Sequence, residues 1–254
     1  MTKNFLEYKK NGFTIIKLFN KKDIILLRKK ISNDFNSKIK KLKPKLKNKN
    51  INIQNYHKLK SIKPILHKSL LKGKDRYIKL NKKLIKKILN NSQLKNLLKN
   101  AWGHNKGSIK FIYSSRKSMR KNLVGYRFAR PYKKYKRDVG GVHLDLHYGG
   151  QFNSNHKALI TIWIPIYGFS KKYTLALYPK SHKNYHSFKK VSLQNKYTSP
   201  VFEKNYEKNY PWFRPNLKLG ESIIFHPNLL HGGSFNRGSS TRVSLDLRIF
   251  NNYL

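Results

Sequence analysis

Cysteine is absent from this 254-residue chain, which excludes disulfide bonds and metal sites built on thiolates. Long apolar runs are absent too, because no uninterrupted stretch approaches the roughly 18 residues that a membrane-spanning helix needs. The N-terminal residues lack the apolar segment of a signal peptide. These absences predict a protein without a membrane segment, and we expect it in the cytoplasm.

Acidic residues are scarce. Ten Asp and Glu stand against 57 Lys and Arg, which gives a formal net charge of +47. Such an excess suits non-specific binding of polyanions, because Lys and Arg neutralise phosphates whatever the base sequence. A biased genome is the favoured explanation, since the lysines are spread through every segment and Lys, Asn and Ile all have A/T-rich codons. Net charge says little about the fold.

The first part of the chain has helical patterns. Apolar residues at helical spacing predict helices over 3–10, 21–38 and 76–102, the last broken near 90–91. Asn20 with Asp23 is typical of a capping box at the start of the second helix. Between the first two helices, 12–18 is a predicted strand. Residues 39–50 are expected to be a basic solvated loop, and 51–74 an irregular helix.

The second part changes to short β-like runs. Segments rich in Val, Ile, Tyr and Phe are separated by Gly, Pro, Asn and Ser, which is typical of an all-β sandwich or jelly roll. The expected strands cover residues 109–113, 124–128, 142–146, 159–166, 173–178, 221–225 and 243–250. Chains of this length often form one domain. We therefore expect a single domain over 1–254, with a mostly helical part over 1–106 and a β core over 107–254 that carries the site.

The chemistry centres on the Gly-Gly-Val-His-Leu-Asp-Leu-His stretch at 140–147, in which His143 and Asp145 lie two residues apart. On an extended strand, residues i and i+2 project to the same face, so the imidazole and the carboxylate point into one space. This pair supplies two of the three ligands that hold the non-haem ferrous ion of oxygenases, which leave further positions on the metal open.

Two downstream histidines can complete the set. His231 follows a strand and a short turn and is flanked by small residues, so it is the preferred third ligand. His226 ends the strand itself and is expected to pack or to support the ligands. Arg242 opens the next strand, and its guanidinium can pair bidentately with a carboxylate. Ser244 lies on the same strand face and can donate a further hydrogen bond to it.

In this order, the residues resemble the phytanoyl-CoA dioxygenase-like family of Fe(II)/2-oxoglutarate-dependent oxygenases. The matching features are His143-x-Asp145, then His231 in a Gly-Glu-(apolar)-Phe-His-x5-His-Gly context, then Arg242-x-Ser244. Residues 176–183 are similar to the family's Pro-Gly-Ser-His loop, with Lys180 in place of the usual glycine. The likeness spans most of the chain and is weakest over 39–75 and 184–215.

The resemblance implies a mainly β fold, a double-stranded β-helix (jelly-roll) core with the N-terminal helices packed on one sheet. It implies Fe(2+) bound by His143, Asp145 and His231, with 2-oxoglutarate as co-substrate and its far carboxylate on Arg242 and Ser244. Dioxygen is then used to oxidise a substrate while 2-oxoglutarate becomes succinate and CO2. Related halogenases lack the carboxylate ligand, so Asp145 favours hydroxylation. The expected substrate is a small lipid-, sugar- or amino-acid-derived metabolite.

Other polar residues have two open roles each. Trp163 is expected beside the co-substrate, with an ordinary core role as an equal alternative. Arg127 and Arg130 are candidates for the substrate side, against a solvated surface role. His147 is expected at the rim of the site, and His182, in the family-like loop, is a candidate to approach it.

Two other functions stay open. The first is a 2-oxoglutarate oxygenase acting on nucleic acid, suggested by the charge and by Arg242-x5-Arg248, which looks like the double-arginine signature of nucleic-acid demethylases. The gap between His231 and Arg242 favours the phytanoyl type, and no aromatic loop dedicated to a flipped base is visible. The second is a non-catalytic polyanion-binding β-sandwich. Neither the substrate nor the oligomeric state follows from the sequence.

Overall fold

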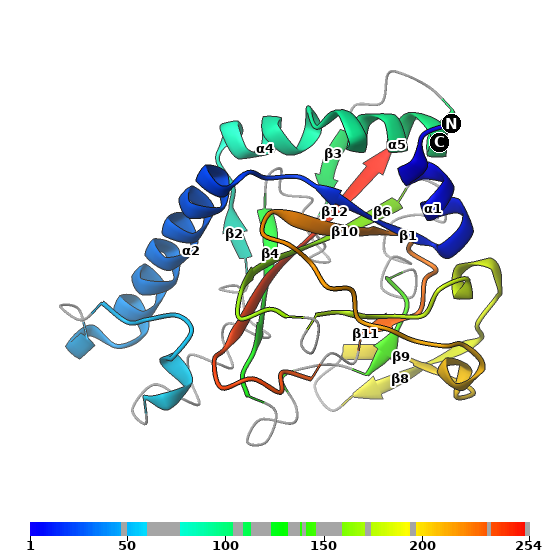
Figure 1. Cartoon of the computed structure of the whole chain (residues 1–254). Coiled ribbons are helices and arrows are strands. Elements are labelled where there is room, and N and C mark those ends of the chain that lie inside the picture. Colours follow the sequence, from blue (N-terminus) through cyan, green and yellow to red (C-terminus); the bar gives the residue numbers. More distant parts are fainter. Residues whose placement is uncertain are drawn as a thin grey trace.

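A large antiparallel sheet is the frame of the molecule (Figure 1). The computed structural model describes residues 1–46, 50–59, 77–103, 109–112, 123–131, 138, 141–145, 159–170, 174–193, 197–232 and 235–251. The sheet has the order β1-β10-β6-β12-β4-β2, and β3 also pairs with β12. Its strands are β1 (Phe13–Lys17), β2 (Tyr77–Lys79), β3 (Ile109–Ile112), β4 (Leu123–Ala129), β6 (Leu159–Tyr167), β10 (Glu221–Phe225) and β12 (Arg242–Asn251).

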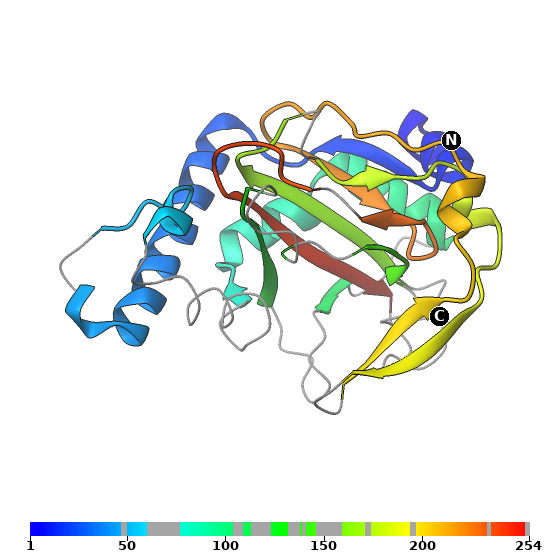
Figure 2. The ribbon, with the colours of Figure 1, turned by 90° about the horizontal axis from the view of Figure 1, so that it is seen from below.

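A smaller three-stranded sheet has the order β5-β11-β7. It is made of β5 (Val142–His143), β7 (Ala176–Leu177) and β11 (His231–Gly232). A separate hairpin, β8 (Phe188–Leu193) with β9 (Tyr197–Phe202), projects at the edge of the molecule (Figure 2). The large and small sheets form the jelly-roll core that was expected, so the predicted fold class is confirmed.

Among the described residues, four helices accompany the large sheet: α1 (Lys3–Asn11), α2 (Lys21–Leu42), α4 (Lys82–Leu89) and α5 (Ser92–Trp102). Apolar side chains of α2, α4 and α5 share one hydrophobic core with the strands, for example Phe35 and Ile88 with Leu245. Figure 1 shows α4 and α5 running together past the ends of the strands and α2 along one side. This shared core supports the proposal that 1–254 form one domain. None of the described helices is long and apolar enough to cross a membrane.

The two faces of strand β12 have different environments. One face packs against the helices in the hydrophobic core, and the other lies inside the jelly roll, between the two sheets. Val243, Leu245, Leu247 and Ile249 are buried in the core shared with the helices. The alternate residues Arg242, Ser244, Asp246 and Arg248 must therefore project from the opposite face of the sheet. That face turns toward the small sheet.

Helix α2 begins with the predicted capping box. The side chain of Asn20 accepts from the Asp23 N–H, and the Asp23 carboxylate accepts from the Asn20 N–H, each at 2.9 Å. The predicted end at residue 38 is wrong, because the helix runs to Leu42. Ile39 is buried four residues after Phe35 and continues the apolar stripe, and the chain leaves the helix just before Pro44.

Other boundaries differ from the predicted ones. Residues 77–79 form an edge strand rather than a helix. The break between α4 and α5 is confirmed, and there the Asn91 side chain accepts from the Leu94 N–H at 3.0 Å. The hairpin β8–β9 lies in a region for which no strand was predicted. Of the predicted irregular helix, 51–59 contains only the short turn η2 (Tyr56–Lys58), and the rest lies outside the described residues.

Candidate metal and co-substrate site

Three predicted ligands meet on the small sheet. His143 on β5 lies directly opposite His231 on β11 in the antiparallel register. Asp145 follows two residues after His143, and one ligand atom from each of the three side chains lies within 4.8 Å of the others. The predicted strand over 142–146 is shorter in the structure, because β5 ends at His143 and Asp145 lies beyond it. Strand alternation therefore does not account for the position of the carboxylate.

Both histidines are oriented by backbone carbonyls. Nδ1 of His143 is 2.9 Å from the Gly141 oxygen, and Nδ1 of His231 is 2.8 Å from the Leu229 oxygen. A carbonyl oxygen only accepts hydrogen bonds, so each Nδ1 carries the proton and each Nε2 keeps its lone pair for a metal. Burial lowers the pKa of His143 to about 3, with a further contribution from His231. The imidazole of His143 is therefore neutral at pH 7, as a ligand must be.

Both oxygens of Asp145 accept hydrogen bonds from the large sheet. Thr161 donates its hydroxyl to Oδ2 at 2.6 Å, and Arg248 donates from a terminal nitrogen to Oδ1 at 2.5 Å. Oδ1 also lies 3.8 Å from Nε2 of His231. Burial alone would raise the pKa of the Asp145 carboxyl, but Arg248, His231 and His143 together outweigh burial and hold this pKa below its ordinary value. Asp145 is therefore an anion at neutral pH.

Gly232, the residue after His231, is glycine for a steric reason. Gly232 has φ +122°, and a Cβ atom there would lie 2.7 Å from the Gly141 oxygen and 3.0 Å from Nδ1 of His143. Only glycine lets β11 approach β5 closely enough for the two imidazoles to meet, with their ring centroids 4.4 Å apart.

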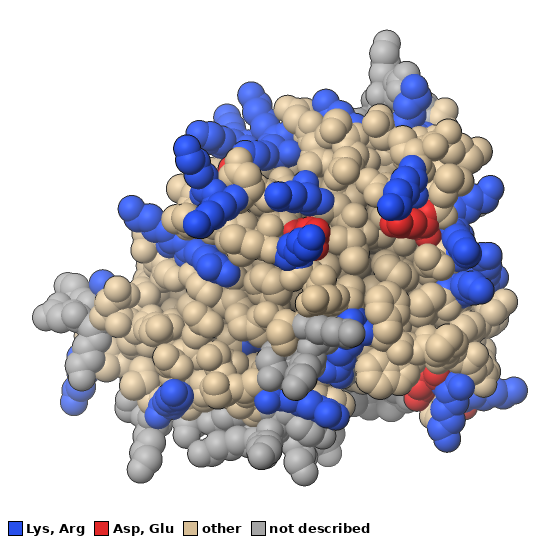
Figure 3. Space-filling model, viewed as in Figure 1, with Lys and Arg blue, Asp and Glu red and all other residues tan. Residues whose placement is uncertain are grey.

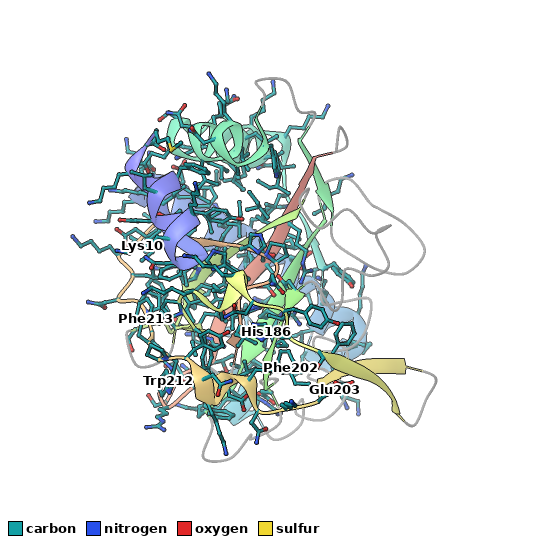
Figure 4. The ribbon with its side chains drawn as sticks, turned by 90° about the vertical axis from the view of Figure 1, so that its right-hand side faces the viewer. Lys10, His186, Phe202, Glu203, Trp212 and Phe213 are labelled. Atoms are coloured by element: carbon teal, nitrogen blue, oxygen red, sulfur yellow. The ribbon has the colours of Figure 1, made fainter. Side chains whose placement is uncertain are left out.

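An apolar cluster supports the ligands from behind. Leu144 lies between two ligands and Leu230 directly precedes the third, and both are buried with Tyr178. Phe202, the last residue of β9, and Tyr206, which follows the hairpin β8–β9, pack against this cluster. Figure 4 shows Phe202 beside His186 near the base of the hairpin, and their ring centroids are 6.2 Å apart. The ligand segments are thus held by packing as well as by hydrogen bonds.

The predicted anchor for the co-substrate lies on the inner face of the large sheet. Arg242 is buried, and its Cζ lies 6.0 Å from the centroid of the Trp163 ring. Burial, with a contribution from Arg214, lowers the pKa of Arg242 to about 10, so the guanidinium stays charged at pH 7. The buried hydroxyl of Ser244 has no hydrogen-bond partner among the described residues. A buried cation beside an unsatisfied hydroxyl suits a carboxylate ligand.

Trp163 is also part of an apolar cluster with Phe13, Leu177 and Phe225. Its two expected roles, core residue and wall beside the co-substrate, are therefore compatible. The Trp163 ring lies beside Arg242 and also belongs to this apolar cluster.

The two arginines considered for the substrate side differ. Arg130 is held by Asp138 through two side-chain hydrogen bonds of 2.7 Å, so it serves the local fold. Arg127 lies opposite Ser244 in the β4–β12 register, and its Nε is 2.5 Å from Oδ2 of Asp246. Its side chain is 44% exposed, and its charge contributes to the lowered pKa of His143. Arg127 is thus the candidate that faces the site.

The other histidines considered in the sequence lie away from the three ligands or outside the described residues. His182 does not approach the three ligands, because its Nε2 contacts the Lys9 carbonyl at 3.2 Å and its ring lies 5.4 Å from His226. His226 packs near Tyr8 on α1, in agreement with a packing role. His147 lies outside the described residues.

The roles of two residues were missed at the sequence level. Arg248 lies on the same strand face as Arg242 and Ser244, so the alternation along β12 could have placed it in the interior. Thr161 sits in an apolar strand and gives no signal of its own. Its role follows only from the register, in which it lies opposite Arg248.

Comparison with known proteins now decides the family. The sequence model described as Phytanoyl-CoA dioxygenase (PhyH) matches residues 86–244, more than half of the chain. The chain belongs to the phytanoyl-CoA dioxygenase family. It is therefore a non-haem Fe(II)/2-oxoglutarate-dependent enzyme, and two imidazoles with one carboxylate suit that metal. No curated protein matches this phytanoyl-CoA dioxygenase family member.

Solved structures share the fold at low identity. The non-haem α-ketoglutarate-dependent carbocyclase SnoK from nogalamycin biosynthesis is 13% identical to this protein, with a TM-score of 0.58. The superposition covers 99% of this chain and 84% of the SnoK chain. The epimerase SnoN in complex with Fe3+, α-ketoglutarate and nogalamycin RO is 11% identical with a TM-score of 0.54, covering 98% and 82%. EctD from S. alaskensis with 2-oxoglutarate and 5-hydroxyectoine is 12% identical with a TM-score of 0.52, covering 99% and 76%.

The one departure in the family-like loop is visible in the backbone. Lys180 has φ +68° and is the one non-glycine residue with positive φ in the described chain. Its N–H donates to the Asn11 carbonyl at 3.0 Å. The loop thus keeps a left-handed residue even though lysine replaces glycine, a conformation that is strained for a side chain with a Cβ atom.

Proposed function

We propose that this enzyme hydroxylates a small-molecule metabolite, with iron held by His143, Asp145 and His231. In this proposal the far carboxylate of 2-oxoglutarate pairs with Arg242 and Ser244. The observation that carries it is the convergence of three ligand atoms within 4.8 Å, with both histidine Nδ1 atoms already satisfied by carbonyls. Such a site is ready for a metal without rearrangement of its imidazoles.

Each residue has a distinct task. The bound iron and 2-oxoglutarate supply the oxidation of substrate by dioxygen, with succinate and CO2 as products. Arg242 orients the co-substrate by pairing with its far carboxylate. It also selects co-substrates that carry this second carboxylate, because a buried cation disfavours a neutral ligand. Trp163 and the apolar cluster around it exclude water from this end of the site. Asp145 occupies the position of a ligand that halogenases lack, which favours hydroxylation.

An exposed guanidinium near the proposed site bears on the substrate. Arg248 is buried in its pair with Asp145, whereas Arg127 pairs with Asp246 and keeps 44% of its side chain exposed. A guanidinium carries five N–H donors, so Arg127 can bind a further acidic group while it holds Asp246. We therefore infer an acidic substrate, whether derived from a lipid, a sugar or an amino acid, with its acidic group toward the exposed guanidinium of Arg127.

The test is formation of succinate. The purified protein with Fe(II), ascorbate and 2-oxoglutarate should form succinate under air, and a panel of acidic metabolites should raise the rate more than neutral analogues. The variant His143→Ala/Asp145→Ala should form none above background. If the double variant is as active as the wild type, or if the wild type binds no divalent metal, the proposal is wrong. Arg127→Gln should reduce the stimulation by acidic metabolites and leave succinate formation without substrate unchanged.

Action on nucleic acid is the second candidate function, favoured by the net charge of +47. Figure 3 shows Lys and Arg side chains scattered over one face rather than gathered along a single groove. Scattered charge supports non-specific binding of polyanions and gives no path to the site. Methylated single-stranded DNA or RNA that stimulates succinate formation more than any acidic metabolite would favour this second function. The cytoplasmic location stays a prediction.

A further inference from the structure

The Asp145 carboxylate is held by two residues of the large sheet that neighbour one another. Thr161 on β6 and Arg248 on β12 lie directly opposite in the antiparallel register. Directly opposite residues project from the same face of a sheet, so both side chains enter the interior side by side. Both are buried, as is Asp145, although they come from segments far apart in the sequence. The contact joins the two sheets at the site.

The two carboxylate oxygens have different surroundings. Oδ1 accepts from Arg248 and also lies 3.8 Å from Nε2 of His231, so it borders the space between the ligands. A carboxylate oxygen has two lone pairs, and one remains for a metal after the bond to Arg248. Oδ2 accepts the short 2.6 Å hydrogen bond from the Thr161 hydroxyl. Oδ2 is thus engaged by a hydroxyl of the large sheet.

We propose that Thr161 and Arg248 are positioning residues that make Asp145 a one-oxygen ligand through Oδ1. This inference rests on the proposed iron site. A carboxylate that bound through both oxygens would take a further position on the metal, and that position is needed by the co-substrate or dioxygen. The Thr161 hydrogen bond retains Oδ2, and the Arg248 guanidinium fixes Oδ1 while compensating the charge of the buried carboxylate.

Thr161 gives the sharper test, because valine has nearly the same shape and lacks the hydroxyl. We expect Thr161→Val to release Oδ2, so that Co²⁺, used as a spectroscopic probe, gains a carboxylate oxygen and changes its visible absorption spectrum. The affinity for Co²⁺ should stay within about threefold of the wild type. The affinity of the Co²⁺-loaded protein for 2-oxoglutarate should fall by about tenfold or more, because the second carboxylate oxygen takes a metal position that the co-substrate needs. Thr161→Ser keeps a hydroxyl and should restore both properties.

Arg248 is tested by its own pair of variants. Arg248→Met should weaken Co²⁺ binding by about 10- to 100-fold, because the carboxylate loses its fixed orientation. Arg248→Lys keeps the charge and one donor and should lose less. Adding Asp145→Asn to Arg248→Met removes the unpaired buried anion, so the melting temperature of the metal-free double variant should exceed that of Arg248→Met alone.

The outcomes distinguish a failure of the proposed iron site from a failure of the positioning role. Wild-type protein that binds no Co²⁺ overturns the proposed iron site itself. Wild-type protein that binds Co²⁺, together with a Thr161→Val variant of unchanged spectrum and unchanged 2-oxoglutarate affinity, overturns the positioning role only. Equal losses of Co²⁺ and 2-oxoglutarate affinity in Thr161→Val would also overturn it, because they indicate a general structural defect.

Discussion

Arg242 combines burial, charge and an aromatic neighbour in one residue. Arg242 is 4% exposed and its guanidinium lies over the Trp163 ring, and Ser244 lies two residues further on the same strand face. Arg248 lies on the same face of β12 and is a second arginine that could anchor the co-substrate. The structure engages Arg248 with Asp145, which leaves Arg242 as the anchor that we propose.

We predict that Arg242→Ala weakens binding of 2-oxoglutarate and spares the metal. Truncation of one partner of a buried charge pair costs about 2–5 kcal/mol, so the Kd should rise by about 30-fold or more. Calorimetry on Co²⁺-loaded protein measures the co-substrate, and a titration of metal-free protein measures the metal. An unchanged Kd for 2-oxoglutarate would show that the anchor lies elsewhere.

Gly232 offers a second residue-scale prediction, about the approach of two strands. Gly232→Ala places a Cβ atom against the Gly141 oxygen and the His143 ring, so β5 and β11 must separate. We expect the affinity for Co²⁺ to fall by about tenfold or more, since the imidazoles lose their relative position.

Gly103 is the matched control for that substitution. It also has positive φ, +77°, but a Cβ atom there has nothing within 4 Å. Gly103→Ala should therefore lose about 1 kcal/mol of stability through backbone strain and keep the metal affinity. If both alanine variants bind Co²⁺ equally well, the close approach at Gly232 is not what forms the site.

At the scale of elements, the end of β10 packs against helix α1. His226 follows β10, its N–H donates to the Gly12 carbonyl at 2.8 Å, and its ring lies 6.1 Å from that of Tyr8. Burial, with a contribution from His182, lowers the pKa of His226 from 6.5 to about 4. The folded state thus favours the neutral ring.

This shift predicts acid sensitivity with a definite sign. Between about pH 6.5 and 4 the unfolded chain binds a proton at His226 that the folded chain excludes, so stability falls as the pH falls through this window. At pH 5 the loss from this group is about 2 kcal/mol relative to pH 7.5. Urea unfolding of the wild type and of His226→Phe at both pH values measures it. A pH dependence that is identical in the two proteins would contradict the assignment.

Strand β12 is the element whose pattern explains most. Its apolar residues close the core under the helices, and its polar residues Arg242, Ser244, Asp246 and Arg248 enter the interior. The alternation of polar and apolar residues along β12 is visible in the sequence, and it identified Arg242 and Ser244. The sequence did not predict that Arg248 pairs with Asp145 or that Asp246 pairs with Arg127. These partners lie in other segments, and only the tertiary structure brings them to β12.

At the scale of the whole molecule, the net charge of +47 predicts a binding behaviour separate from the site. The protein should be retained on heparin or RNA at low salt and released by modest salt, because each phosphate contact contributes about −0.7 to the slope of log K against log salt. The variant His143→Ala/Asp145→Ala should elute at the same salt. Retention that survives high salt, or that depends on base sequence, would point to a dedicated nucleic-acid site.

The sequence by itself determined the ingredients of this protein: the helices followed by strands, the ordered ligands His143, Asp145 and His231, and the strand that opens with Arg242. These features are local, because periodicity, capping and motif spacing act within a few residues. Only the tertiary structure decided which groups hold the ligands. The hydrogen bonds of Thr161 and Arg248 to Asp145 depend on the packing of the large sheet against the segment that carries Asp145. The close approach of Gly232 to His143 depends on the pairing of β11 with β5. Both join segments far apart in the chain, and patterns that act within a few residues do not encode such contacts.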